Sequence, residues 1–244
     1  MNYFEFTQIP KGEDGIPGGV YYVDFPDYQN KVIGGLGNGK FGQWVNKMAI
    51  KTGIRSVPLG HAGVMIVDEN GNTKYYEYGR YKQSDSKTIG IESNNGAGNW
   101  RRVTVPNAVM TNGSLDHDGT AKRLSKSFGK DVDLVYVDNA DPVKVNAAIL
   151  ESSKNADRPG YHLFGANCGS EAYRVIDEGQ SKTTNALEGL TRTAKGALLG
   201  SVAGGGVGAL VGAGLSYFKG LTPSAKKRAL QREGHASGSY DIKS

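Results

Sequence analysis

An α+β domain with a central antiparallel sheet is the fold class that this 244-residue sequence predicts. Two β-prone runs, 61–67 and 74–78, flank a segment that contains an Asn-Gly pair, which is the strongest short-range signal for a β-hairpin. Further strands and helices are mixed along residues 1–182 around this hairpin. This mixture, with an antiparallel hairpin at its centre, is typical of the α+β class.

The other predicted elements follow from local patterns. The strands are short β-prone runs at residues 20–23, 100–105 and 132–137. The helices are predicted at residues 41–50, 118–128, 142–153 and 170–178. In the third of these, Asp141 is placed to cap the helix and Pro142 occupies its first position.

The net charge of +5 is a property of the C-terminus. Residues 219–244 contain six Lys and Arg and two Asp and Glu, so the rest of the chain is close to neutral. A domain that binds nucleic acid carries its positive charge across a folded face, and the sequence therefore excludes nucleic acid as a partner. We interpret the basic tail as a solvated terminus, with contact to an anionic surface or a partner as the alternative.

The chain contains a single cysteine, Cys168, so its fold does not depend on an internal disulfide. No basic segment followed by an apolar run stands at the N-terminus, which predicts synthesis in the cytoplasm without a Sec signal, or export by another route. The sequence predicts neither a cofactor nor a bound metal.

Cys168 is the candidate nucleophile. It follows a turn-forming Gly-Ala-Asn and opens a predicted helix, where unpaired amide groups and the helix dipole favour a thiolate. A small buried core residue is the alternative role for a lone cysteine.

A thiolate nucleophile needs a base, and His61 is the best placed of four histidines. It begins the first hairpin strand, so its side chain can project while the strand is held in the core. His117 is predicted in a polar loop, His162 on the approach to a turn, and His235 in the basic tail. Glu77 on the returning strand could orient the imidazole, or it could simply face solvent.

These residues together resemble the circularly permuted branch of the papain-like NlpC-type hydrolases, which includes the lecithin retinol acyltransferase-like enzymes. In that branch the histidine precedes the cysteine, as His61 precedes Cys168 here. The resemblance covers about residues 55–180. It implies a papain-like fold and a thiol hydrolase or transferase that works through an acyl-enzyme. Glu77 departs from the third residue of the family, which is often a histidine.

The resemblance also implies roles for single residues. Cys168 would attack an amide or ester carbonyl, His61 would transfer the proton, and Glu77 would hold the imidazole tautomer. Asn167 and Tyr161 match the family's residues beside the nucleophile, with oxyanion or positioning roles. The backbone N–H of Cys168 would be an oxyanion donor.

After a linker at residues 183–195, a glycine-rich segment at residues 196–218 contains no charge and is predicted as helical. Its glycines recur every four residues, at Gly196, Gly200, Gly204, Gly208 and Gly212. This spacing and length suit close helix packing in a bilayer, with Lys195 and Lys219 as anchors at the interfaces. A flexible arm, or a hairpin of two short helices on the catalytic domain, is the alternative.

A papain-like hydrolase with such a segment and no Sec signal resembles a bacterial antagonistic effector of the type VI secretion kind. The resemblance implies cleavage of peptidoglycan peptides in the target-cell periplasm and an immunity protein as a partner. A thiol acyltransferase or phospholipase acting on lipid is the first alternative. A non-enzymatic membrane-inserting protein is the second.

Overall fold

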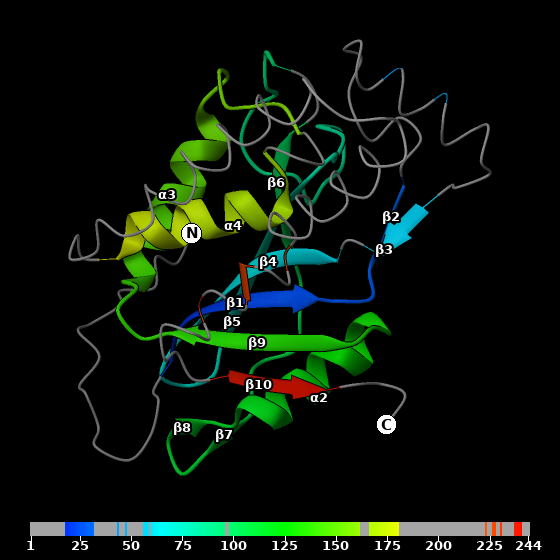
Figure 1. Ribbon diagram of the computed structural model, residues 1–244. Helices are drawn as coiled ribbons and strands as arrows, with labels where there is room; N and C mark the ends of the chain where they lie inside the picture. The colour runs from blue at the N-terminus through cyan, green and yellow to red at the C-terminus, as the bar shows by residue number, and fades with distance from the viewer. Residues whose placement is uncertain are drawn as a thin grey trace, which may run out of the picture.

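The structure is a computed structural model (Figure 1). It describes residues 18–31, 43, 47, 56–58, 60–95, 98–161, 166–180, 223, 226, 227, 230 and 237–240. The predicted linker 183–195 and the glycine-rich segment 196–218 lie outside the described residues. Of the helix predicted at 41–50, only Gln43 and Lys47 are described, and both are helical.

A six-stranded antiparallel sheet forms the centre of the described structure, in the order β10-β9-β1-β4-β5-β6. Its strands are β1 (Gly19–Phe25), β4 (His61–Val67), β5 (Thr73–Gly79), β6 (Asn99–Val103), β9 (Val132–Val137) and β10 (Ser237–Tyr240). The mixed fold with a central antiparallel sheet is therefore confirmed. That the fold is papain-like stays a prediction.

The predicted hairpin is confirmed as β4 and β5. Its five-residue connection is held by Asp68, whose side chain accepts hydrogen bonds from the N–H groups of Asn70 (2.9 Å) and Asn72 (2.8 Å). Gly71 adopts a φ of 82°, which a residue with a Cβ rarely does. The turn therefore depends on Asp68 as much as on the Asn-Gly pair.

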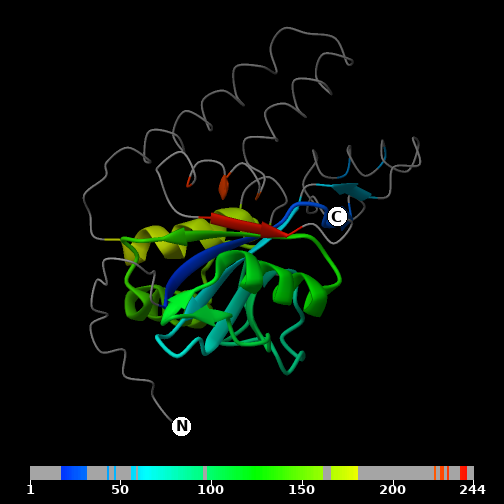
Figure 2. The same ribbon diagram turned by 90° about the horizontal axis from the view of Figure 1, so that it is seen from below.

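Among the described residues, two helices cover one face of the sheet and one covers the other (Figures 1 and 2). The helices are α2 (His117–Phe128), α3 (Pro142–Lys154) and α4 (Cys168–Gly179). Val145 and Ile149 of α3 and Ile176 of α4 pack in one buried cluster with side chains from alternate positions of β1 and β4. Leu124 of α2 packs in a second cluster on the opposite face. Because successive side chains of a strand point to opposite faces, the sheet has a hydrophobic core on each of its two faces.

Two short pairs were not predicted: β2 (Gln29–Lys31) with β3 (Ser56–Pro58), and β7 (Met110–Thr111) with β8 (Ser114–Leu115). The predicted helices at 118–128, 142–153 and 170–178 are confirmed within two residues at each end. As predicted, the Asp141 side chain caps α3, accepting from the N–H groups of Val143 and Lys144.

The basic tail differs from the prediction of a solvated terminus. Its strand β10 pairs with β9 at the edge of the sheet, and Leu230 is buried in the α3/α4 core. Lys227 forms an ion pair with Asp133 and lies 3.7 Å from a carboxylate oxygen of Asp24, which is fully buried. Part of the tail's charge therefore balances acidic side chains of the sheet.

Pro223 brings the tail into contact with α4. Its carbonyl accepts a hydrogen bond of 3.1 Å from the buried Tyr22 hydroxyl. A Cβ on Gly169, the second residue of α4, would lie 3.1 Å from the Pro223 Cα, so the two backbones are in close contact. Among the described helices, none is long and apolar enough to cross a membrane.

Candidate active site

His61 and Glu77 meet on the sheet surface because of the hairpin register. Gly63 lies directly opposite Glu77, so His61 is its diagonal neighbour on the same face. The imidazole Nε2 contacts the Glu77 Oε2, and both side chains are buried. Gly60, with a φ of 77°, makes the turn that leads into His61.

Arg101 of β6 extends this pair to a third residue. It lies opposite Glu77 in the β5/β6 register, and its Nε donates to Glu77 Oε1 at 2.7 Å. The guanidinium carbon is 3.9 Å from the centre of the Tyr81 ring. Burial raises the pKa of Glu77, but the contacts with His61 and Arg101 lower it more, so its pKa is below the usual value and the carboxylate is ionised.

Cys168 is the first residue of α4, as the sequence predicts. The Asn167 side chain caps the helix by accepting the Ser170 N–H at 2.9 Å, and the Ser170 hydroxyl accepts the Asn167 N–H at 2.9 Å. This reciprocal capping box fixes the start of the helix. These contacts of Asn167 therefore position the first turn of α4, with Cys168 in it.

His61, the backbone of Ala62 and the Tyr161 hydroxyl lie around the thiol of Cys168 and favour its ionised form. Because Glu77 occupies Nε2 of His61, Nδ1 is the nitrogen left for the sulfur. Burial raises the pKa of the thiol, but the charge of His61 and the contacts with these three groups lower it more, and the net shift is downward.

The pKa of His61 moves in the opposite direction. Burial lowers it, but the negative charges and hydrogen bonds of Cys168 and Glu77 raise it well above its usual value. A lowered thiol pKa beside a raised imidazole pKa favours transfer of the proton from Cys168 to His61. The Tyr161 hydroxyl and the carboxylate of Glu77 complete the surroundings of the two groups.

Aromatic rings and cations surround the pair. The Tyr28 ring lies 4.9 Å from the His61 ring, and the Lys130 ammonium lies 4.9 Å from the centre of Tyr28. On the other side, the Arg80 guanidinium is 5.7 Å from the centre of the Tyr161 ring. Tyr28 and Tyr161 are both half-buried. Each of these tyrosine rings therefore lies beside a cationic side chain.

The structure thus brings together His61, Glu77, Cys168 and Tyr161, with Asn167 at the cap. His117, predicted in a loop, begins α2, which covers the face of the sheet opposite α3 and α4, and its ring contacts Tyr21 and Tyr136. His162 and His235 lie outside the described residues.

Three groups of the site, Arg101, Tyr81 and the backbone of Ala62, were not predicted from the sequence. Arg101 lies in a run predicted as a strand, and only the pairing of that strand with 74–78 would have placed it beside Glu77. In the described part of the chain, no three His, Cys, Asp or Glu side chains gather in a way that could hold a metal ion.

A thiolate paired with an imidazolium, which a buried carboxylate orients, is a nucleophile with a general acid beside it. Such an arrangement suits attack on a carbonyl carbon and proton donation to the leaving group. Cys168 is 2% exposed and His61 7%, so the pair is largely shielded from water.

Comparison with known proteins gives a family for this chain. Residues 21–176, more than half of the chain, match the model of the family described as "Type VI secretion system effector TseH-like". The crystal structure of the type VI secretion system effector TseH is 23% identical, with a TM-score of 0.45, over 68% of this chain and 78% of that one. No curated protein matches significantly. On the family match, this chain belongs to the TseH-like family of type VI secretion system effectors.

Proposed function

We propose that this effector is a cysteine hydrolase that works through an acyl-enzyme and cleaves peptide or amide bonds in peptidoglycan. The observation that carries the proposal is the Cys168–His61 pair, in which the thiol pKa is lowered and the imidazole pKa is raised. A core cysteine without a catalytic role would have its pKa raised by burial.

In the first step, the Cys168 thiolate attacks the carbonyl carbon and a C–S bond forms. The tetrahedral intermediate collapses, the scissile C–N bond breaks, and the His61 imidazolium gives its proton to the leaving nitrogen. The product amine departs and an acyl-thioester remains on Cys168. In the second step, His61 takes a proton from water, the resulting hydroxide attacks the thioester, and the thiolate is released.

The backbone N–H of Cys168 is the candidate oxyanion donor. It lies at the first position of α4, where an α-helix leaves its amides without internal partners. Among the described residues it makes no hydrogen bond. The positive end of the α4 dipole adds to the stabilisation of negative charge at this point.

Glu77 and Arg101 act on the pair indirectly. The Glu77 carboxylate stabilises the imidazolium and holds it with Nδ1 toward the sulfur. Arg101 holds the other carboxylate oxygen and keeps Glu77 ionised. We regard both as positioning residues, whereas Cys168 and His61 touch the reacting atoms.

Peptidoglycan as the substrate rests on the likeness to NlpC-type hydrolases together with the effector family. Type VI effectors are secreted and act in target cells, and the target-cell periplasm gives access to peptidoglycan. We also propose that an immunity protein protects the producing cell. Contact of residues 196–218 with a membrane remains a proposal that the described residues do not test.

The experiment compares the wild type with Cys168→Ala and Cys168→Ser on purified muropeptides, with products identified by mass spectrometry. We expect cleavage by the wild type and none by either variant. Glu178→Gln, on the exposed surface of α4, is the matched control and should retain wild-type cleavage.

Phospholipid vesicles form the second arm of the experiment. Release of fatty acid that depends on Cys168, with intact muropeptides, would assign the thiol to a lipid substrate and refute the peptidoglycan assignment. Toxicity in the periplasm that survives Cys168→Ala would refute the thiol mechanism and favour a membrane-inserting protein.

A further inference from the structure

The outer edge of β6 is only partly covered by the loop that precedes it. The Arg102 N–H donates to the Lys87 carbonyl at 2.9 Å. The reciprocal bond is missing, because the Lys87 N–H donates instead to Asp85 Oδ1 at 3.0 Å. The loop therefore leaves the edge at Lys87, and the strand continues without a neighbour on that side.

The backbone beyond this point is open. In an antiparallel ladder the N–H and C=O of one residue point to the same side, so the Arg102 carbonyl also points away from β5. Continuing the alternation of β6 past its last residue, Val103, places the N–H and C=O of Thr104 on the same side. Within the described part of the chain, the Arg102 C=O and the N–H and C=O of Thr104 have no hydrogen-bond partner.

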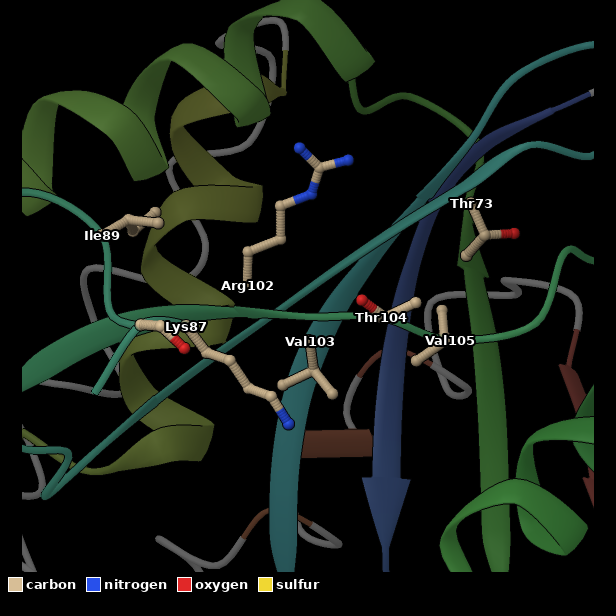
Figure 3. A pocket seen from close by; sticks show the side chains of 8 residues that line it. Thr73, Lys87, Ile89, Arg102, Val103, Thr104 and Val105 are labelled. Carbon is tan, nitrogen blue, oxygen red and sulfur yellow. The ribbon is translucent and has the colours of Figure 1, made fainter.

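A hollow of about 350 Å³ lies along this edge (Figure 3). Its lining mixes hydroxyl, aliphatic and basic side chains, from Thr73, Ser86, Lys87, Ile89, Arg102, Val103, Thr104 and Val105. The volume is in the range of ligand sites in proteins. The lining contains no carboxylate.

The edge carries two exposed cations, Lys87 and Arg102. Neither forms an ion pair with any described residue. Burial, followed by the charge of Arg102, lowers the pKa of the neighbouring Lys74, although Asp68 acts against this shift. Asp68 and Asp85 already accept hydrogen bonds from backbone N–H groups in turns.

The two cations do not converge. In Figure 3 the Lys87 and Arg102 side chains leave the edge in different directions, so a single small anion would meet only one of them. Adjacent residues of an extended peptide point to opposite faces of a sheet and can meet both. Its backbone would pair with the open groups of Arg102 and Thr104.

We propose that the β6 edge at Arg102–Val105 binds an extended, acidic segment of a partner protein, which adds to the sheet as a seventh strand. Backbone pairing supplies affinity, and adjacent acidic side chains of the partner pair with Lys87 and Arg102. The inference is independent of the proposed hydrolase activity, because it uses no residue of the Cys168 site.

The test uses blocked six-residue peptides of Val and Thr with two adjacent Glu in the middle, and a matched peptide with Gln in place of Glu. Binding to the full chain is measured by calorimetry, at low and high salt. We expect the Glu peptide to bind at least roughly tenfold more tightly than the Gln peptide at low salt. Lys87→Glu and Arg102→Glu should each weaken binding of the Glu peptide by about tenfold. Lys144→Glu, on the exposed surface of α3, should leave this binding unchanged.

Thr104→Pro separates strand addition from charge attraction. It removes the outward N–H without removing a bond to β5, and Thr104→Ala is its matched control. We expect Thr104→Pro to weaken peptide binding while Thr104→Ala retains it. Equal binding by these two variants, or by the Glu and Gln peptides, overturns the proposal. Binding of inorganic phosphate that depends on Arg102, without binding of the Glu peptide, overturns it in favour of a small-anion site.

Discussion

Glu77→Gln is the sharpest test of the electrostatics of the site. The substitution keeps the shape of the side chain and removes the negative charge beside Nε2 of His61. The two side chains are 9% and 4% exposed, so water screens their interaction little. A hydrogen bond to a charged group contributes about 1.5–3 kcal/mol, which corresponds to a roughly tenfold to hundredfold change in an equilibrium constant.

The expected change in the reactivity of Cys168 follows from the directions of the pKa shifts. Without the carboxylate, the imidazolium is less stable, so the pKa of His61 falls and that of Cys168 rises. Less thiolate is then present near neutral pH. The rate at which iodoacetamide alkylates Cys168 should fall by about tenfold to hundredfold, and its pH profile should move to higher pH.

This assay needs no substrate, so it tests the pair apart from any activity. Glu178→Gln is the control, because it removes a carboxylate from the same helix as Cys168 but on its exposed surface. Thermal unfolding of each variant checks that the fold is retained. An alkylation profile of Glu77→Gln identical to that of the wild type would refute a role for Glu77 in the pair.

Three further substitutions test parts of the fold. Lys227→Met should lower the free energy of unfolding in urea by about 3 kcal/mol, because it removes a cation beside the buried Asp24; a change below about 1 kcal/mol would contradict this. Asn167→Ala should cost about 1 kcal/mol through loss of the α4 cap, and Asn167→Asp should recover most of it; equal losses would show that the cap does not matter. Gly63→Ala should lower the melting temperature, at a cost of about 1–3 kcal/mol, since its Cβ would overlap the Tyr75 side chain; an unchanged melting temperature would refute this contact.

The sequence predicts the site well where local patterns determine it. An apolar run beginning at His61 and a β-prone return through Glu77 specify a hairpin, and the hairpin alone brings their side chains to one face. The turn before Cys168 and the helix after it are also local features, and the structure has the helix starting at Cys168.

Pairing between strands that are distant in the chain could not be predicted from the sequence. Arg101 reaches Glu77 only because β6 pairs with β5 in one register, and no local pattern specifies that register. β10, with the sequence Ser-Gly-Ser-Tyr, has no apolar alternation and becomes a strand through its pairing with β9. The hairpin of β7 and β8 is different, since its Asn112-Gly113 turn, with positive φ at both residues, is a local signal for a hairpin in the sequence.

The return of the tail to the sheet constrains the topology of the chain at a membrane. Gln180 at the end of α4 is bridged to Ala140, and Pro223 is hydrogen-bonded to Tyr22, so both residues belong to one folded unit. A segment that leaves a folded unit and rejoins it has both ends on the same side of a bilayer. While β10 stays paired, residues 181–222 can therefore cross a membrane an even number of times or not at all, and a single-pass anchor would require the tail to detach from the sheet.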